Sequence, residues 1–397
     1  MEYNPLDPKV KADPYPYYQH LRREHPVYRV EPLGVYAISR HEDVLFATNH
    51  PELFSSFGFS NTEIRGEPAK MMIFTDPPDH TRLRNVVNRS FTPKMVADME
   101  PRIRQVTDDL VAAIAERGEM DLIADLAIPL PVTIIAELLG VDPAHKGDFK
   151  RWSDWIVLDF MGNQLNDEER AQMEADMDAF QSYFEQAVGE RRERRNGDLI
   201  SALIRAEEDQ QALTAGEVLA FIALLLVAGN ETTTNLIGNA LVALTDHPDQ
   251  LEKVAGDPSL IPNLVEETLR YDAPVQFLFR RATQDVEMAG TTIPEGSLTV
   301  VLFGSANRDE RRFAEPERFD VTRDAQGHLA FGHGIHFCLG APLARLEAKV
   351  ALEALLSRFR NFARKEHEVE YVASVFLRGP QRLPLTFEPA AAEAQTR

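Results

Sequence analysis

The spacing of hydrophobic and polar residues along the chain predicts mostly helices. Over much of the sequence, apolar residues recur every three to four positions, which places them on one face of an α-helix. A helix also begins after the consecutive prolines Pro77 and Pro78, because proline interrupts the preceding structure. The other segments with the helical pattern are residues 14–25, 41–54, 95–117, 125–140, 148–160, 167–196, 264–271 and 341–359.

Short extended segments interrupt the helices. Residues 27–31 and 35–39 are strand-like runs on either side of Gly34, as in a β-hairpin. Further strand-like runs lie at residues 275–281, 286–288, 297–303 and 369–387. We therefore expect one domain over residues 1–397, mostly α (an α+β fold), with a small β-rich subdomain formed mainly from residues 27–40, 275–303 and 369–388.

One predicted helix is much longer than the others. Thr214 and Glu217 form a capping-box pattern, and the helical pattern continues to His247, a length of roughly 48 Å. The first half is apolar on all sides, which indicates a buried helix. AGNETTT, residues 228–234, then interrupts the pattern. Glycine and an acid are unfavourable in a buried helix, and Thr232 can bond back to a carbonyl one turn earlier. The interruption indicates either a helix–helix contact or a functional groove.

Composition limits the function classes. The chain has 397 residues, 44% of them hydrophobic, which is enough for a large core. Its net charge of −21 argues against nucleic acid as a partner. The amino terminus has no apolar run after a basic start, and the longest apolar stretch, residues 218–229, falls short of the ~20 residues that span a bilayer. We expect a cytoplasmic protein without a membrane anchor.

Cys338 is the only cysteine, so it cannot form an internal disulfide. A free cysteine is most often a small buried hydrophobic residue. Here, however, Gly332, Gly334 and Gly340 surround it, and a predicted helix begins directly afterwards. A helix amino terminus favours a thiolate, and His336 adds a second polar group nearby. A thiolate in a glycine-rich loop is suited to binding heme iron on one face.

The segment FGHGIHFCLG, residues 331–340, resembles the heme-binding signature of the cytochrome P-450 family at Phe331, Gly334, Cys338 and Gly340. The resemblance implies heme b as cofactor and the cytochrome P-450 fold, with heme between the long helix and the helix after the cysteine. It makes Cys338 the iron ligand. The cofactor-binding residues it implies in this segment are Phe331, Gly332, His336, Cys338 and Gly340.

Further motifs follow in the order that the family has. Ala228–Thr232 resembles the family's oxygen-binding groove, with Glu231 and Thr232 as an acid–alcohol pair that supplies protons, although many bacterial members have aspartate in place of Glu231. The resemblance also implies a structural charge network of Glu267, Arg270 and Arg318. His80, Arg84 and Arg280 would bind the heme propionates with His336. Arg281 is the alternative to Arg280.

Apolar residues near these motifs are candidates for a substrate pocket. The segment 55–79 has no clear period but many large apolar residues, which indicates either a covering loop or a substrate lid. The candidate pocket residues are Phe57, Phe74, Leu224, Leu225, Ala228, Val275, Phe277 and Phe376. We expect a fatty acid, terpenoid, steroid or macrocycle as substrate.

The resemblance implies a monomeric monooxygenase that uses dioxygen and receives electrons from a ferredoxin or flavodoxin with its reductase. The segment 82–104 is basic in a strongly acidic protein and is the expected docking surface, together with Arg345, Lys349 and Arg358. Two alternatives are a peroxide-driven heme-thiolate peroxygenase and a heme sensor without enzymatic activity. Neither needs a redox partner, and a sensor needs no acid–alcohol pair.

Overall fold

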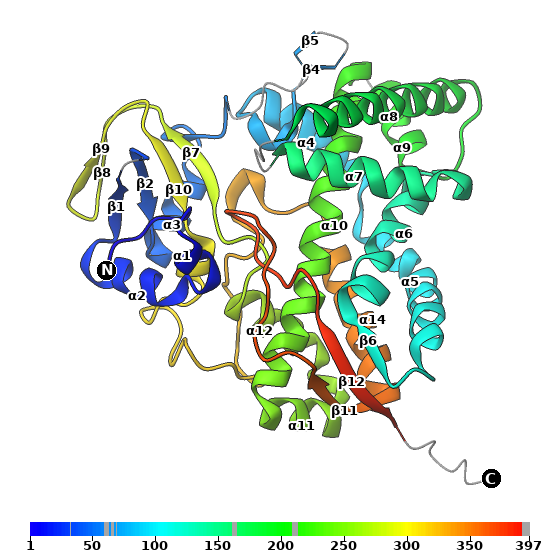
Figure 1. The fold of residues 1–397 in the computed structure, drawn as a ribbon. Helices are drawn as coiled ribbons and strands as arrows, with labels where there is room; N and C mark the ends of the chain where they lie inside the picture. Colours follow the sequence, from blue (N-terminus) through cyan, green and yellow to red (C-terminus); the bar gives the residue numbers. More distant parts are fainter. Residues whose placement is uncertain are drawn as a thin grey trace.

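The computed structural model describes residues 1–397 except 32, 59–62, 65–66, 69, 161–164, 209–212 and 391–397. Helices make up most of it, on the right in Figure 1. The helices of this part are α4 (Asp79–Ser90), α5 (Pro93–Ile114), α6 (Pro129–Leu138), α7 (Lys146–Phe160), α8 (Asp167–Glu193), α9 (Leu199–Glu208), α10 (Ala215–Asp246), α11 (Pro248–Gly256), α12 (Ile261–Tyr271) and α14 (Ala341–Arg358). Short turns lie at η1 (Met72–Phe74), η2 (Ile123–Ala127), η3 (Pro143–His145), η4 (Pro258–Leu260) and η5 (Gly334–His336).

A smaller β-rich part lies on the left in Figure 1. Its five-stranded sheet has the order β1-β2-β10-β7-β3, and the pair β8-β9 lies beside it. The strands are β1 (Val27–Val30), β2 (Val35–Ile38), β3 (Phe54–Ser55), β7 (Leu278–Ala282), β8 (Val286–Met288), β9 (Thr291–Ile293) and β10 (Leu298–Val301). The helices α1 (Pro8–Ala12), α2 (Tyr15–Glu24), α3 (His41–Asn49) and α13 (Phe303–Ala306) belong to the same part.

The carboxyl-terminal strand departs from the prediction. We expected residues 369–388 in the β-rich subdomain, but β12 (Pro384–Pro389) pairs with β11 (Phe359–Arg364) and β6 (Glu119–Asp121) in a separate sheet on the helical side. The earlier part of the tail does reach the β-rich part, through the isolated bridge from Val275 to Leu377 and through Phe376 and Leu377, which pack in its hydrophobic cluster. The reason is local: β11 follows α14 directly, and the rings of Phe359 and Phe387 stack with centroids 4.0 Å apart. The remaining strand pair, β4 (Glu63–Ile64) with β5 (Glu67–Pro68), lies at the top in Figure 1.

The predicted helix positions agree with the structure, with shifts at the ends. The segment 41–54 forms a helix only as far as Asn49, because Pro51 follows and Phe54 joins the sheet. Prolines at 129 and 131 begin α6 rather than break it, since proline is tolerated in the first turn. Helix α9 was not predicted, although Leu199, Ile200, Leu203 and Ile204 have the spacing of a buried helix face. Helix–helix contacts hold it, chiefly with α4 and α8.

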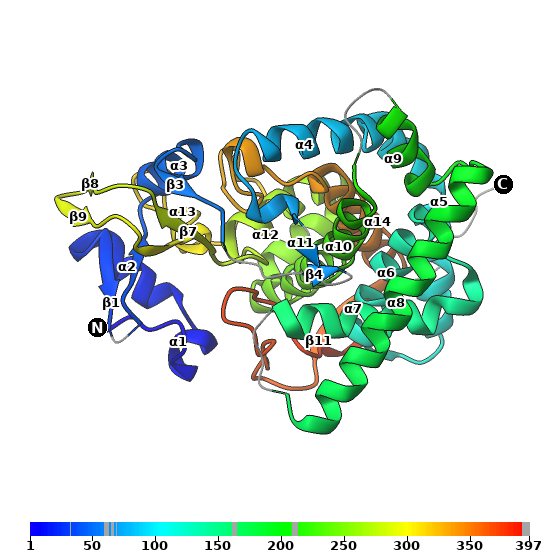
Figure 2. The same ribbon diagram turned by 90° about the horizontal axis from the view of Figure 1, so that it is seen from above.

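Helix α10 crosses the middle of the molecule (Figures 1 and 2). Its predicted capping box is present: Thr214 Oγ1 accepts the Glu217 N–H at 3.1 Å, and Glu217 accepts the Thr214 N–H at 2.9 Å. Among the described residues, α10 is the one helix long and apolar enough to span a membrane. Of its apolar window, 65% is buried inside the protein, so it serves as a core helix.

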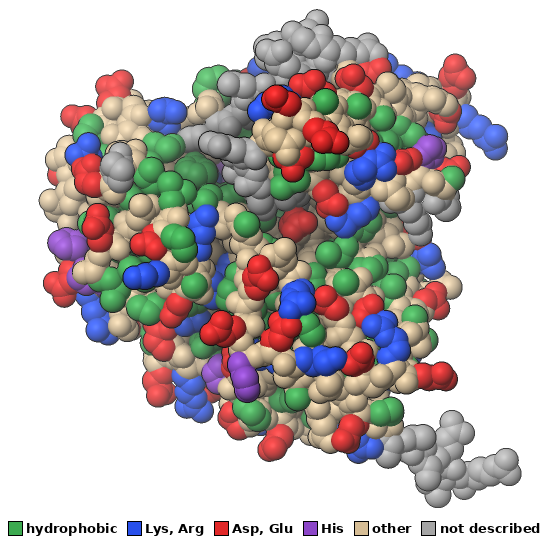
Figure 3. Space-filling model, viewed as in Figure 1, with side chains coloured by type: hydrophobic (Ala, Val, Ile, Leu, Met, Phe, Trp, Pro, Cys, Tyr) green, Lys and Arg blue, Asp and Glu red, His purple; other side chains and the backbone are tan. Residues whose placement is uncertain are grey.

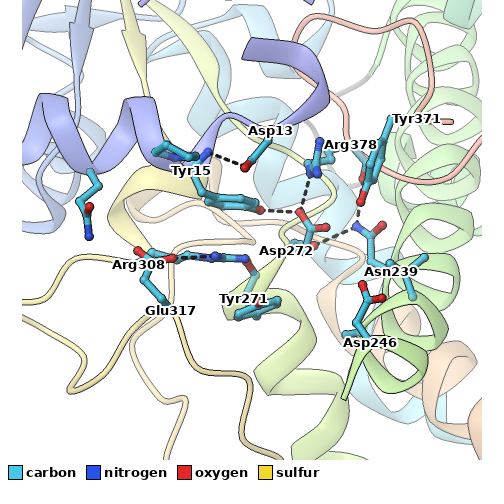
Figure 4. A pocket seen from close by; sticks show the side chains of 14 residues that line it. Asp13, Tyr15, Asn239, Asp246, Tyr271, Asp272, Arg308, Glu317, Tyr371 and Arg378 are labelled. Atoms are coloured by element: carbon cyan, nitrogen blue, oxygen red, sulfur yellow. Dashed lines mark hydrogen bonds and ion pairs between the residues drawn. The ribbon is translucent and has the colours of Figure 1, made fainter. Parts of the chain in front are cut away.

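A polar seam joins the β-rich part to the helices (Figure 4). The carboxylate of Asp272 accepts hydrogen bonds from the Tyr15 hydroxyl and from Arg378 Nε, and the Arg308 guanidinium lies between the rings of Tyr15 and Tyr271. These groups line a pocket of about 450 Å³. The first residue of α10 that lines this pocket is Asn239. It lies about 10 Å beyond Thr232 along the helix axis. Because its charged groups bind one another, the pocket serves to join the two parts.

Phe277 and Phe376 do not line a substrate pocket, contrary to the prediction. They are 2% and 6% exposed and belong to a hydrophobic cluster with Tyr3, Tyr18 and other residues of the β-rich part. A side chain that lines a cavity keeps accessible surface, whereas these rings are enclosed by protein. They are core residues.

Replacing Phe277 with alanine should therefore destabilise the fold. We expect a loss of about 3–5 kcal/mol in the free energy of unfolding, the usual cost of removing a buried phenylalanine ring. Chemical denaturation would measure it. Phe57→Ala is the matched control, because Phe57 is 67% exposed, and it should change stability by less than about 0.5 kcal/mol. Equal stability of the two variants would contradict the core assignment.

Candidate functional site

The loop before α14 presents Cys338 at the amino terminus of a helix. The Cys338 N–H donates to the Phe331 carbonyl at 2.9 Å and closes the loop, and α14 begins three residues later at Ala341. Gly334 makes the turn possible. It has a φ of +70°, and a Cβ there would lie 2.3 Å from the Thr48 carbonyl oxygen. Glycine is therefore required where the loop packs against α3.

Burial outweighs the other electrostatic effects on the Cys338 sulfur, so the pKa of the thiol is raised overall. Burial raises the pKa of the thiol, while hydrogen bonds from the Gly340 and Ala341 N–H groups and the charges of Arg84 and Arg345 lower it. A metal cation on the sulfur would offset the cost of burial and favour the thiolate. Among the described residues, no group of three or more His, Cys, Asp or Glu side chains is placed to hold a metal ion. A metal on Cys338 therefore needs further ligands from a cofactor, as in heme.

Four basic side chains meet beside the loop. The rings of His80 and His336 lie 4.3 Å apart, and the buried Nε2 atoms of both lack a hydrogen-bond partner in the described part of the chain. Arg280 is buried and donates to the Phe279 carbonyl at 2.6 Å. Figures 1 and 2 both show α4, which carries His80 and Arg84, next to the loop that leads to α14.

The pKa values of these groups are lowered by burial, and Asp76 offsets the shift only in part. Burial and the neighbouring cations lower the pKa of His80 to about 4 and that of His336 to about 2. Burial also lowers the pKa of Arg280 to about 10, with Asp76 opposing the shift. Orphaned ring nitrogens and a buried guanidinium fit a ligand that carries carboxylates, and heme has two propionates. The four residues expected to bind the propionates therefore lie together, with Asp76 nearby.

The face of α10 that carries the predicted acid–alcohol pair is open. Ala228 is exposed although it lies in the middle of a core helix, and Leu225, Glu231 and Thr232 are half-buried. Leu225, Ala228 and Thr232 are three and four residues apart and share one side of the helix. Other protein atoms leave this side uncovered, which allows a ligand to approach it.

Helix α10 is continuous through residues 228–234, where the apolar pattern of the sequence is interrupted. Thr232 Oγ1 donates to the Ala228 carbonyl at 2.6 Å, which confirms the expected back-bond. A Cβ on Gly229 would lie 2.1 Å from Ile135 Cδ1, so this glycine serves the contact between α10 and α6. Burial raises the pKa of Glu231, and the charge of Lys150 on α7 opposes the shift.

Apart from the core residues Phe277 and Phe376, the candidate pocket residues fall into three groups. Phe74, Leu225, Ala228 and Val275 keep accessible surface. Leu224 is buried in a small cluster with Met71 and Ala220, so the segment before α4 covers it. Phe57 is largely exposed, unlike a residue enclosed in a pocket. Asp76 ties the base of this segment, since it accepts bonds from Ser55 Oγ at 2.5 Å and from the Ser56 N–H at 3.0 Å.

The structural charge network is present with a different third member. Glu267 and Arg270 are fully buried and joined by two hydrogen bonds of 2.8 and 2.9 Å. The prediction of Arg318 is wrong: its side chain is 54% exposed and lies nearest Glu315 and Asp320. Arg323 Nε instead donates to Glu267 at 3.2 Å. Arg318 contributes only its backbone carbonyl, which accepts from Arg270.

Comparisons with known proteins agree with this geometry. The family model described as Cytochrome P450 matches residues 146–257 and 259–387. Cytochrome P450 107B1 of Saccharopolyspora erythraea is 43% identical, over 91% of this chain and 92% of that protein. The vitamin D(3) 25-hydroxylase of Pseudonocardia autotrophica is 40% identical, over 96% and 95%. The structure of cytochrome P450 CYP109Q5 from Chondromyces apiculatus has 45% identity and a TM-score of 0.90, covering 98% of this chain and 99% of that one.

The stability of the heme-free protein should fall as the pH decreases below about 6.5. The pKa values of His80 and His336 are lowered in the folded state, so the unfolded chain takes up protons that the folded chain does not bind. A bound dicarboxylate should raise both pKa values and flatten the pH dependence. Thermal unfolding of the heme-free and heme-loaded protein at pH 7 and pH 5 would measure it.

A matched pair of variants tests the assignment. The double variant His80→Gln, His336→Gln should lose most of the pH dependence of the heme-free protein. His367→Gln, which changes an exposed histidine, should keep it. The same slope in both variants would place the titrating groups elsewhere.

Proposed function

Because the chain belongs to the cytochrome P450 family, whose members are heme-dependent monooxygenases, we propose that it oxidises an apolar small molecule with dioxygen. The reaction inserts one oxygen atom by hydroxylation or epoxidation. The family and the fold predicted from the sequence are confirmed by the matches. Membership implies a heme cofactor, a redox partner and a small-molecule substrate.

One observation carries the proposal: Cys338 and the four basic side chains His80, Arg84, Arg280 and His336 lie together beside the loop before α14. We assign Cys338 as the iron ligand, with the Gly340 and Ala341 N–H groups supporting its charge. His80, Arg84, Arg280 and His336 would hold the propionates. The cofactor is heme b, since the sequence has one cysteine and so lacks the CxxCH attachment motif of c-type heme.

When bound, heme supplies the oxidative chemistry of dioxygen, and the protein supplies position and protons. Glu231 lies beside Lys150 on α7, and burial raises the pKa of its carboxyl group. Thr232 Oγ1 lies on the open side of α10 and can pass a proton from its hydroxyl while Ala228 holds its position. We propose that Glu231 takes up protons and Thr232 delivers them.

The substrate class follows from the open residues. Phe74, Leu225, Ala228 and Val275 present apolar surface, which favours a fatty acid, terpenoid, steroid or macrocycle. The relative from Pseudonocardia autotrophica is named a vitamin D(3) 25-hydroxylase, an enzyme for a large apolar molecule, which supports the same class here. We propose a cytoplasmic, monomeric enzyme with one catalytic domain over residues 1–397.

The proposed electron donor is a ferredoxin or flavodoxin with its reductase, docking on the Cys338 side. Most cations expected to bind it are already paired. Acids bind Arg82, Arg102, Arg104, Arg345, Lys349 and Arg358. Phe337, directly before Cys338, is 41% exposed and offers an apolar contact. We infer docking by a mixed apolar and polar surface.

Turnover tests the proposed function. The heme-loaded protein, with ferredoxin, its reductase and reduced nicotinamide, should convert an apolar substrate to a product with one added oxygen atom from labelled dioxygen. A peroxygenase would instead form the product with peroxide alone. A sensor would bind the substrate, with a change in the heme spectrum, but would form no product.

Replacing Thr232 with alanine should separate electron consumption from product formation. Folding, heme content and substrate affinity should stay nearly unchanged, while product per reduced nicotinamide falls about tenfold or more, since positioned proton transfer contributes ~10²–10⁴-fold. The lost electrons should appear as hydrogen peroxide. Product and peroxide are measured together.

Thr233 and Thr234 provide the controls for this variant. Thr233 bonds to the buried Glu347, and Thr234 Oγ1 donates to the Ala127 carbonyl at 2.8 Å, so both hydroxyls point away from the open side. Their alanine variants should lose stability and keep the ratio of product to nicotinamide. An unchanged ratio in Thr232→Ala would remove the proton-delivery role.

Salt should slow reduction by the partner only modestly. Exposed charges are screened within ~10 Å at 0.1 M salt and ~3 Å at 1 M, but the paired arginines contribute little net field. Stopped-flow reduction at increasing salt would measure the slope. Phe337→Ala should slow reduction at every salt concentration, whereas Phe46→Ala, a similarly exposed ring on α3, should not. A steep salt dependence with no effect of Phe337→Ala would favour a purely electrostatic surface.

A further inference from the structure

Glu266 lies next to the buried Glu267 on α12 but faces the Cys338 side. Its carboxylate accepts two hydrogen bonds from Arg345 on α14, from Nε at 2.6 Å and from Nη2 at 3.0 Å. It also lies 3.0 Å from Nε2 of His328, in the segment that leads to the cysteine loop. These contacts hold the pKa of Glu266 at about 2, so the carboxylate is ionised.

The hydrogen bonds of His328 determine its tautomer. The Ala330 N–H donates to His328 Nδ1 at 3.2 Å, so Nδ1 carries no proton. The proton of the neutral ring is therefore on Nε2, where it is donated to Glu266. The imidazole side chain is 5% exposed, and it links α12 to the backbone of the loop at Ala330.

Two short paths lead from Glu266 to Cys338. Through His328 it reaches Ala330 and then Phe331, whose carbonyl accepts the Cys338 N–H at 2.9 Å. Through Arg345 it reaches the Phe331 ring, since the guanidinium lies 4.5 Å from the ring centroid. Arg345 also acts on the sulfur directly, because its charge lowers the pKa of Cys338.

We propose that Glu266 is a positioning residue that sets the reduction potential of a heme bound to Cys338. It neutralises the charge of Arg345 beside the sulfur and holds the cysteine loop through His328. This inference rests on the proposed heme ligation by Cys338. A negative charge near iron disfavours added electron density, so Glu266 lowers the potential and Arg345 alone would raise it. In this pair, Arg345 is bound to an acid of the protein although its side chain is partly exposed.

Opposite shifts of the potential test the inference. In spectroelectrochemical titrations of the heme-loaded protein, Glu266→Gln should raise the reduction potential and Arg345→Gln should lower it. The double variant should return close to the unmodified value. A purely structural clamp would move both single variants in the same direction, because either change loosens the same loop, and that result would overturn the proposal.

Two controls keep the test decisive. Glu353→Gln removes the same charge from α14 about 12 Å further along the helix and should leave the potential unchanged. Arg345→Lys keeps the charge and should shift the potential less than Arg345→Gln, which tests the charge effect even where Glu266→Gln fails to fold. Equal shifts in Arg345→Lys and Arg345→Gln would contradict it.

The proposed heme ligation is tested separately. The reduced, carbon monoxide-bound protein should show the absorption band after which the family is named, and Cys338→Ala should lose it. If Cys338→Ala keeps this band, the proposed ligation is wrong and the inference falls with it. If the band behaves as expected but the potentials do not move in opposite directions, only the inference is wrong.

Discussion

The burial of charge around Cys338 is the constraint on which the site depends. Surrounding protein atoms remove part of the hydration of the thiol, the two histidine rings and the Arg280 guanidinium, at a desolvation cost that no acid of the described chain fully offsets. A ligand with a cation at one position and carboxylates at its edge removes these costs together. Heme would be such a ligand, with Cys338 holding its iron and the basic cluster holding its propionates. The residues that cost stability in the heme-free protein would therefore contribute to affinity for the cofactor.

Such a site requires a rigid frame, and three elements provide it. Helix α10 forms one wall, and its close contact with α6 at Gly229 fixes its position. Helix α14 carries the amide groups that face the sulfur. Helix α12 joins them through adjacent acids: Glu267 holds the segment before the loop through Arg270 and Arg323, and Glu266 holds the loop and α14. Buried ion pairs of this kind specify geometry more than they stabilise, because their mutual attraction mainly offsets the loss of hydration.

The sequence allowed prediction of those features that depend on local pattern. The capping box at Thr214, the helix after Cys338 and the spacing of His80 and Arg84 are all readable within one or two helical turns. Contacts between segments that lie far apart in the sequence could not be predicted from it. Arg318 and Arg323 have the same charge and lie five residues apart, and only the path of the loop places Arg323 on Glu267. Phe277 is apolar, as a pocket residue would be. However, it lies directly before β7 and packs on amino-terminal residues. Likewise, β12 pairs with β11 because the chain turns back between these two strands. The alternation of polar and apolar residues in β12 could not show this turn.

The paired arginines show why a count of charges does not define a docking surface. The segment 82–104 carries an excess of basic residues, yet Arg82, Arg102 and Arg104 bind acids from α10, α6, α5 and α14. Of their partners, Glu100 lies within this segment, but Glu137, Glu217 and Glu353 lie outside it, so a local window counts the cations and misses most of the anions. On the face shown in Figure 3, acidic and basic side chains are likewise interspersed rather than separated. Because opposite charges a few ångströms apart cancel at longer range, these pairs fasten helices to one another and leave little field for a partner. Recognition of an electron donor then depends on surface shape and on apolar contact near Phe337, which directly precedes Cys338 in the chain.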